Sequence, residues 1–209
     1  MMRIESVASQ PDRAGRHMVR FDDGTTMRLY RQTVQDFGLY PGLEMTDGEV
    51  EQLRIAAGAM SAKMRAVRII AATNVSKGDL ERRLIHKGED PKQAKEAAQW
   101  MVDMELLNDR RTAEQVVQRC ASKGYGAARA KQALYEKRIP KQYWEDALAD
   151  YPDQTEAIVD FLRSRLKDDW QDRDLRKAMD ALIRRGHSYC QIRKGLERLS
   201  LDTEDFLEE

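Results

Sequence analysis

The stretch ELLNDRRTAEQVVQRCASKGYGAARAKQALYEKRI, residues 105–139, decides the fold of this 209-residue chain. Its first half has apolar residues at positions i, i+3, i+4, i+7 and i+8, namely Ala113, Val116, Val117, Cys120 and Ala121. This spacing predicts an amphipathic helix with one buried face. Asn108 or Asp109 can cap its first turn, and Gly124 or Gly126 can end it, because glycine adopts positive φ angles without steric cost. A second helix is expected to start near Ala127.

The same pattern recurs along the chain with a period near 50 residues from Ala62 onward. Leucines stand 50 and then 48 residues apart, at Leu84, Leu134 and Leu182. Each is followed three residues later by a basic residue, Lys87, Lys137 and Arg185, and then by Gly88, Arg138 and Gly186. Further on, the same offsets predict the inward face of a third helix in each repeat, at Ala94, Trp144 and Ile192 and at Ala98, Leu148 and Leu196.

These repeats predict a mainly α protein of three tandem three-helix, helix-turn-helix-like units in an elongated curved array. Its nine repeat helices include one over Met64–Thr73, and a small amino-terminal β extension precedes them, with strands at Arg3–Val7, Met18–Phe21 and Met27–Tyr30. The expected divisions are a β extension with a linker helix over 1–60, repeats over 61–107, 108–150 and 151–200, and an acidic tail over 201–209. Thr46 or Asp47 is expected to cap the helix that enters the repeats.

Charge is balanced over the whole chain, with 36 Lys and Arg residues against 36 Asp and Glu residues. Along the chain, the five divisions carry net charges of −2, +2, +3, +2 and −5. Three mildly basic repeats therefore lie between acidic ends. This distribution permits a local surface that faces phosphate groups, but it is far from the excess charge of a histone-like protein.

No arrangement of residues typical of catalysis is present in the sequence, which has no P-loop, G-x-S-x-G or H-E-x-x-H motif. No catalytic residue, metal site or cofactor is expected. Cys120 and Cys190 are expected to be small buried hydrophobic residues, and His17, His86 and His187 to have structural or surface roles. The three tryptophans are expected in seams between repeats. The sequence lacks a long apolar run and a signal peptide, so a cytoplasmic protein without membrane contact is expected.

The central stretch resembles the RecX family of regulatory proteins, bacterial modulators of the RecA recombinase. The matching residues are Leu106, Leu107, Asp109, Ala113, Lys123, Gly124, Tyr125, Gly126, Arg129, Leu134 and Lys137. Two positions depart from the family pattern. Thr112 replaces a usual aromatic residue, which is expected to weaken a core contact. Arg138 replaces a usual glycine, which is expected to remove a helix terminator.

The resemblance implies a non-enzymatic, monomeric regulator that binds RecA filaments on single-stranded DNA. It would modulate recombinase, ATPase and co-protease activities, with inhibition the expected direction, and so act in homologous recombination, DNA repair and the SOS response to DNA damage. Two other hypotheses remain open. One is a tandem helix-turn-helix protein that acts directly on nucleic acid, and the other is a helical-repeat adaptor for a different protein.

Basic residues on the second helix of each repeat are the candidates for filament or DNA binding. With one aromatic residue they are Arg82, Arg83, Lys87, Lys123, Tyr125, Arg129, Lys131, Lys137, Arg184 and Arg185. Stacked repeats would join them into a discontinuous positive track. Some have a simpler explanation, since Lys87, Lys137 and Arg185 lie at helix ends, where a cation is stabilised by about 0.3 to 1 kcal/mol whatever the function. Tyr125 could equally fill a seam between helices.

Overall fold

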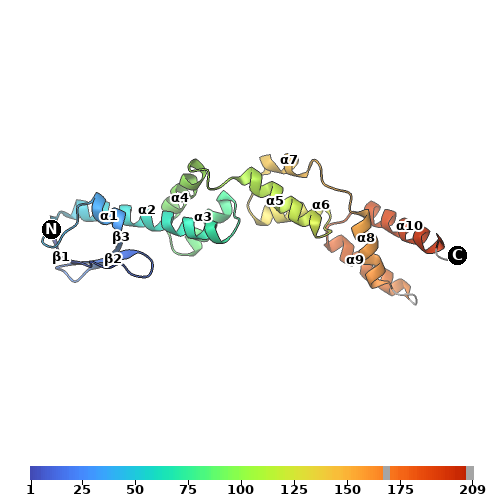
Figure 1. Ribbon diagram of the computed structural model, residues 1–209, viewed down its shortest axis with the longest axis horizontal. Helices are drawn as coiled ribbons and strands as arrows, with labels where there is room; N and C mark the ends of the chain where they lie inside the picture. Colours follow the sequence, from blue (N-terminus) through green and yellow to red (C-terminus); the bar gives the residue numbers. More distant parts are fainter. Residues whose placement is uncertain (167–169, 206–209) are drawn as a thin grey trace. The chain divides into compact units, whose positions relative to one another are not determined.

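The computed structural model of the chain describes residues 1–166 and 170–205, with side chains as far as Ser200. This part of the chain is mainly helical, with ten α-helices, one short 3-10 helix and a small antiparallel sheet, as the sequence predicts (Figure 1). The chain divides into two compact units, Met1–Leu107 and Asn108–Glu209.

The first unit begins with a four-stranded antiparallel sheet in the order β3-β2-β1-β4. Its strands are β1 (Met2–Val7), β2 (Arg16–Phe21), β3 (Thr26–Tyr30) and β4 (Glu44–Met45). Gly24, with φ +83°, makes the turn between β2 and β3, as its Asp-Gly sequence predicts. The three predicted strands are confirmed. The fourth, β4, was missed because two residues are too short to show an alternating pattern.

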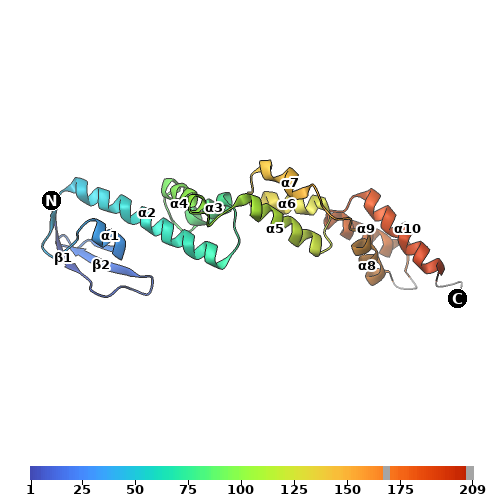
Figure 2. The same ribbon diagram turned by 45° about the horizontal axis from the view of Figure 1, so that its top comes forward.

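Helix α2 (Asp47–Ala72) follows the short helix α1 (Arg31–Asp36). It contributes buried side chains to two hydrophobic cores of the first unit. Thr46 caps α2 with a reciprocal capping box to Glu49, which confirms the start predicted there. Its first half packs Val50 and Leu53 against the apolar face of the sheet. Its second half packs Ala62 and Ala66 against α3 (Lys77–His86) and α4 (Pro91–Asp103) (Figure 2).

The prediction of a separate helix over Met64–Thr73 is wrong, because α2 runs without a break through the expected boundary at residue 60. Its middle is rich in alanine, the best helix former, and contains no proline. Gly58, which would weaken an isolated helix, has a packing role here: a Cβ at this position would overlap the side chain of Gln93 on α4. The close approach of the Gln93 side chain on α4 therefore favours a glycine at this position of α2.

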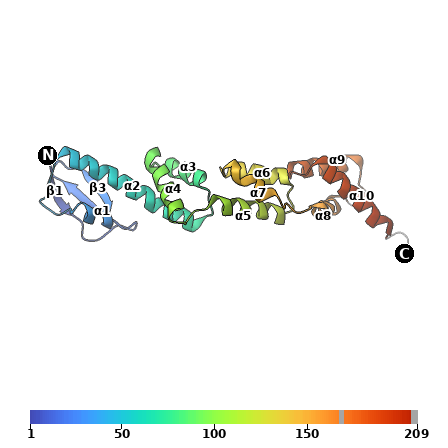
Figure 3. The ribbon, with the colours of Figure 1, turned by 90° about the horizontal axis from the view of Figure 1, so that it is seen from above.

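The second unit contains two helical groups, each with its own core (Figure 3). The first group has α5 (Asp109–Ser122), α6 (Ala127–Glu136), the 3-10 helix η1 (Lys141–Tyr143) and α7 (Trp144–Leu148). The second has α8 (Thr155–Arg165), α9 (Asp172–Arg184) and α10 (Tyr189–Asp205). Asn108 caps α5 by accepting a hydrogen bond from the Arg111 amide, and α6 starts at Ala127, both as predicted. The acidic segment 201–209 begins within α10, and residues 206–209 lie outside the described residues.

The turn after the second helix of each repeat has the same backbone conformation at three equivalent positions. Gly88, Arg138 and Gly186 have φ angles of +90°, +54° and +88°. The residues before them, Lys87, Lys137 and Arg185, are the C-caps of α3, α6 and α9. Arg138 therefore does not remove the helix terminator, contrary to the sequence-based expectation. The helix ends there with an arginine in the left-handed region that favours glycine.

Several single-residue predictions are corrected or refined by the structure. Cys120 is buried, and burial raises the pKa of its thiol, but Cys190 is exposed on the first turn of α10. Thr112 is buried and donates a hydrogen bond from its hydroxyl to the Asn108 carbonyl, so a satisfied polar group occupies the place of the usual aromatic residue. Trp170 is 47% exposed, so it does not fill a seam.

The other two tryptophans also lie elsewhere than predicted, since each packs within one helical group. Trp100 packs against the core that α2, α3 and α4 share, with the Lys63 ammonium 5.1 Å from its ring centroid. Trp144 packs in the core of α5, α6 and α7, and its indole N–H donates to the Ile139 carbonyl. A tryptophan in a three-helix group of small, alanine-rich helices therefore completes that group's own core.

Candidate functional site: two arginine-lined grooves

Each unit has a groove lined by basic residues. In the first unit, the α2–α3 groove has a volume of about 390 Å³ and is lined by Arg65, Arg68, Ile69, Ala72, Thr73, Arg83 and Lys87. The two helices place these side chains together because Arg65 and Arg68 are three residues apart on α2, while Arg83 and Lys87 are four apart at the end of α3. The groove therefore combines four cations with a short apolar floor.

Two buried carboxylates neutralise much of the charge of the α2–α3 groove. Asp79, only 2% exposed, forms ion pairs with Arg82 (2.6 Å) and Arg83 (2.9 Å). Glu89, whose side chain is 7% exposed, forms an ion pair with Arg65 at 2.8 Å. Removing one partner of a buried pair leaves an uncompensated charge, which is costly. Arg65, Arg82 and Arg83 therefore stabilise the first unit, and their charge is largely compensated inside it.

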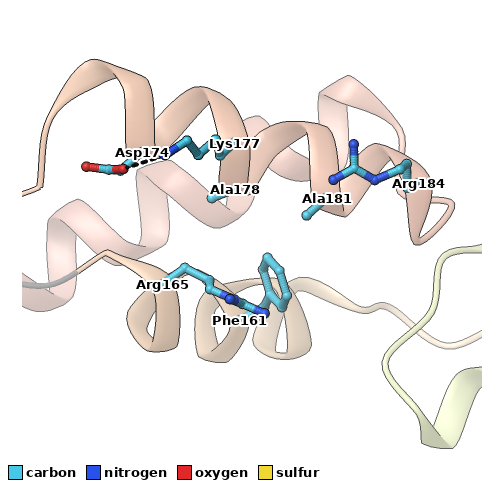
Figure 4. A pocket seen from close by; sticks show the side chains of 7 residues that line it. All are labelled: Phe161, Arg165, Asp174, Lys177, Ala178, Ala181 and Arg184. Atoms are coloured by element: carbon cyan, nitrogen blue, oxygen red, sulfur yellow. Dashed lines mark hydrogen bonds and ion pairs between the residues drawn. The ribbon is translucent and has the colours of Figure 1, made fainter.

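In the second unit, the α8–α9 groove is lined by Tyr125, Arg129, Phe161, Arg165, Ala181, Arg184 and Arg185, and has a volume of about 330 Å³. It continues into a neighbouring cavity of about 430 Å³ along the same two helices (Figure 4). The two cavities share Phe161, Arg165, Ala181 and Arg184. Arg165 and Phe161 extend from α8 and Arg184 from α9, so both helices contribute cations to one groove.

Two of the four arginines of the α8–α9 groove are held by aromatic rings. The Arg185 guanidinium lies 5.0 Å from the Tyr125 ring centroid and 5.1 Å from the Phe161 ring centroid. The Arg165 guanidinium lies 5.5 Å from the same Phe161 ring. We call this series Tyr125, Arg185, Phe161 and Arg165 the cation–aromatic ladder. Cation–π contacts of this kind fix a guanidinium in place without neutralising it.

Within residues 1–166 and 170–200, few carboxylates oppose the charge of this groove. Arg129 forms an ion pair with Glu136 at 3.1 Å, and Lys177 forms one with Asp174 at 3.4 Å at the far end of the second cavity. For Arg165, Arg184 and Arg185, no ion pair is present with the residues that the structure describes. Among the described residues, the middle of the α8–α9 groove therefore keeps three positive charges without an ion-pair partner.

Two turns of the second unit approach each other closely at one edge of this groove. The Gly126 amide donates to the Arg185 carbonyl (2.9 Å), and Arg185 Nη2 donates to the Lys123 carbonyl (2.9 Å). A Cβ on Gly126 would overlap the Gly186 carbonyl, and a Cβ on Gly186 would overlap the backbone of Arg129. The two glycines thus allow backbone contact between α6 and the turn after α9, and this contact sets the position of Arg185.

His187 lies buried between the same two turns, a region that we call the seam. Its Nε2 donates to the Gly124 carbonyl at 3.1 Å, and its Nδ1 is buried without a hydrogen-bond partner among the described residues. Burial lowers the pKa of this imidazole below its ordinary 6.5, the hydrogen bond raises it in part, and the charge of Arg185 lowers it. Near neutral pH the ring is therefore uncharged, with its proton on Nε2.

Tyr125 has the seam role that the sequence left open, with its ring against Arg185 and its carbonyl accepting a hydrogen bond from the Tyr151 hydroxyl at 2.6 Å. Burial raises the pKa of Tyr151 to about 12, so this hydroxyl stays protonated and keeps donating at physiological pH. The Tyr125 ring nevertheless also lines the α8–α9 groove.

The structure distributes the ten predicted site residues unevenly. Tyr125, Arg129, Arg184 and Arg185 meet in the α8–α9 groove, and Arg83 and Lys87 meet in the α2–α3 groove. Lys123 contributes its carbonyl to the seam, whereas Arg82, Lys131 and Lys137 line neither groove. Sequence reasoning missed Arg65, Arg68, Phe161 and Arg165. The spacing of four residues between Phe161 and Arg165 on a predicted helix could have indicated their contact.

Within the part of the chain that the structure describes, no group of three or more His, Cys, Asp or Glu side chains could hold a metal ion. In the same part, no helix is both long and apolar enough to cross a membrane.

Fold and site together define a helical-repeat protein with arginine-lined surface grooves. A family model described as "RecX, second three-helix domain" matches residues 108–148, which include α5, α6 and α7. The regulatory protein RecX of Xanthomonas campestris pv. campestris (strain B100) is 32% identical over 133 residues, which cover 62% of this chain and 82% of that protein. The chain therefore belongs to the RecX family of regulatory proteins.

Other similar proteins agree with this assignment. The regulatory protein RecX of Vibrio campbellii is 26% identical over 158 residues, which cover 73% of this chain and 98% of that protein. A crystal structure of regulatory protein RecX matches 91% of this chain and 97% of that chain with a TM-score of 0.65 at 18% identity. A RecX structure from Lactobacillus salivarius matches 70% of this chain and 99% of that chain with a TM-score of 0.60 at 24% identity. At these identities, the two structures support the fold alone. The curated relatives are named as regulatory proteins, not as enzymes.

Proposed function

We propose that this protein is a non-enzymatic regulator that binds RecA filaments on single-stranded DNA and modulates, chiefly by inhibition, recombinase, ATPase and co-protease activity. Membership of the RecX family is the observation that carries this proposal. The arginine-lined grooves supply a physical basis, because a nucleoprotein filament presents phosphate groups and acidic protein surfaces that arginines bind well. The protein would act in the cytoplasm during recombination and the SOS response.

Binding to the filament is the first consequence to test. Purified protein is mixed with RecA, single-stranded DNA and a slowly hydrolysed ATP analogue, and the filaments are sedimented. We expect the protein to sediment with the filaments and to stay in solution with RecA alone. Equal sedimentation with DNA alone would instead favour a tandem helix-turn-helix DNA-binding protein, and failure to sediment with any of these would favour an adaptor for another partner.

A further inference from the structure

The two grooves differ in how their arginines are held in place. In the α2–α3 groove, Arg65 and Arg83 are fixed by buried carboxylates, so their charge is already paired. In the α8–α9 groove, Arg165 and Arg185 are fixed by aromatic rings, and neither has an ion-pair partner among the described residues. The second arrangement orders two guanidinium groups in advance and leaves their positive charge available. In the α2–α3 groove, Arg68 also lacks an ion pair among the described residues, but its guanidinium donates to the Ala14 carbonyl and the Tyr30 hydroxyl.

Ordering in advance favours ligand binding because an arginine that is already immobilised loses less conformational entropy when the ligand binds. The cation–aromatic ladder has already restrained two of the groove's arginines in the free protein. Arg185 is restrained further, since its Nη2 donates to the Lys123 carbonyl. An anion that enters the groove therefore meets two arginines that are already ordered, beside the exposed Arg184.

We propose that the α8–α9 groove is the main polyanion site of the chain and that its ligand is the phosphate backbone of a single polynucleotide strand. Arg165, Arg184 and Arg185 would contact phosphates. This inference rests on the proposed function, and it assigns the contact with the DNA strand to one groove. A positive groove that also carries aromatic rings is the combination that single-strand binding proteins use, and this combination favours a polynucleotide over an acidic protein segment.

The number of free arginines predicts the salt dependence of binding. Three arginines that each neutralise one phosphate of a single strand give a slope of about −2 for log K against log salt concentration. Between 50 and 200 mM salt, this slope corresponds to a loss of roughly 20-fold in affinity. The slope is shallow compared with that of proteins with many phosphate contacts, which is consistent with a chain of zero formal net charge.

The test compares two charge-matched double variants by fluorescence anisotropy with a labelled oligothymidylate of about 20 nucleotides. Arg165→Gln with Arg184→Gln removes two exposed groove arginines and leaves Arg185 in the seam. Arg173→Gln with Arg176→Gln removes the same charge from exposed positions of α9 outside the groove. We expect the groove variant to bind roughly tenfold more weakly with a slope nearer zero by about 1.4, and the control to change about twofold with its slope kept.

Equal weakening in the two variants would overturn the assignment to this groove. Competition provides the second arm, with inorganic phosphate and poly-glutamate as competitors at matched charge. We expect neither to displace the oligonucleotide as well as unlabelled oligothymidylate does, and displacement by poly-glutamate at equal charge would overturn the proposal in favour of an acidic protein ligand. Both arms use DNA alone, so they can fail while RecA modulation persists, and RecA modulation can fail while they succeed.

Discussion

Arg138 is the one residue at the three repeat turns that adopts a positive φ angle without being glycine. A left-handed conformation costs a residue with a Cβ about 1 to 2 kcal/mol, although glycine loses part of this gain because its unfolded chain is more flexible. We expect Arg138→Gly to raise the free energy of unfolding of the second unit by up to about 1 kcal/mol, measured by urea denaturation.

The control for this prediction is Lys131→Gly in the interior of the same helix, α6. Lys131 is exposed and helical, so a glycine there should lower the free energy of unfolding by about 1 kcal/mol. The two glycine substitutions thus have opposite expected signs. If Arg138→Gly destabilises as much as Lys131→Gly, the left-handed turn at Arg138 is not strained.

His187 makes the stability of the second unit depend on pH. Because its pKa is lowered in the folded protein, the unfolded chain binds more protons, and stability is lost as pH falls below about 6.5. A glutamine side chain at this position would keep an N–H donor for the Gly124 carbonyl and would not titrate. We therefore expect His187→Gln to flatten the fall in melting temperature between pH 7 and pH 5. Identical pH profiles of melting temperature for the parent protein and His187→Gln would show that His187 does not contribute to the pH dependence of stability.

For single residues, the sequence predicted helix caps correctly, but it did not predict the positive φ angle of Arg138 or the exposure of Cys190. Asn108 and Thr46 are the helix caps expected from residue type alone, since a short side-chain oxygen before a helix can accept a hydrogen bond from an unpaired amide of the first turn. The turn at Arg138 was misjudged because the residue type argues against a positive φ, and only the contacts of the folded repeat enforce one. The exposure of Cys190 likewise depends on which face of α10 packs against the core, and the short apolar pattern around Cys190 does not determine that face.

At the scale of elements, the contact between α6 and the turn after α9 depends on glycine. Gly126 has φ −76°, so alanine there meets no backbone strain, and its cost is the overlap of the new Cβ with the Gly186 carbonyl and the His187 backbone nitrogen. We expect Gly126→Ala to lower the free energy of unfolding of the second unit by about 1 to 3 kcal/mol. Urea denaturation followed by tyrosine and tryptophan fluorescence measures this change.

Gly48→Ala is the matched control, because Gly48 also lies near the start of a helix, and the only side-chain atom near a Cβ there is Thr46 Oγ1 at 4.0 Å. This substitution should be neutral or stabilise the first unit by about 0.4 to 1 kcal/mol. A Gly126→Ala protein as stable as the Gly48→Ala protein would mean that the two turns do not need backbone contact.

Helix boundaries were harder to predict than helix positions. The repeat pattern located α3, α6 and α9 through Leu84, Leu134 and Leu182, and it located α4 through Ala94 and Ala98. The apolar stripe after Asn108 located α5. All of these residues except that stripe's partly buried Ala121 are buried. The repeat pattern divided α2 wrongly, because the expected boundary at residue 60 followed the start of the repeats at Ala62 and not a helix stop signal. It gave no indication that the third helix of the second repeat would be as short as α7, which begins only after the 3-10 turn Lys141–Tyr143.

At the scale of the whole molecule, a formal net charge of zero conceals an unequal distribution of free charge. The sequence identified helix-two arginines as candidates, but it could not separate Arg82 and Arg83, paired with the buried Asp79, from Arg184 and Arg185, which have no such pair among the described residues. That distinction depends on which carboxylates fold inward. The cation–aromatic ladder could not be predicted from the sequence either, because Tyr125 and Phe161 are 36 residues apart.

We propose that this protein regulates a recombinase filament without catalysing a reaction itself. The most direct measurement is the steady-state ATPase rate of RecA on single-stranded DNA while the protein is titrated in, with filament length followed in parallel by electron microscopy. We expect the rate to fall at less than one protein molecule per RecA protomer, with a shift to higher concentrations for the Arg165→Gln, Arg184→Gln variant. An unchanged ATPase rate and unchanged filament length across the titration would contradict the account.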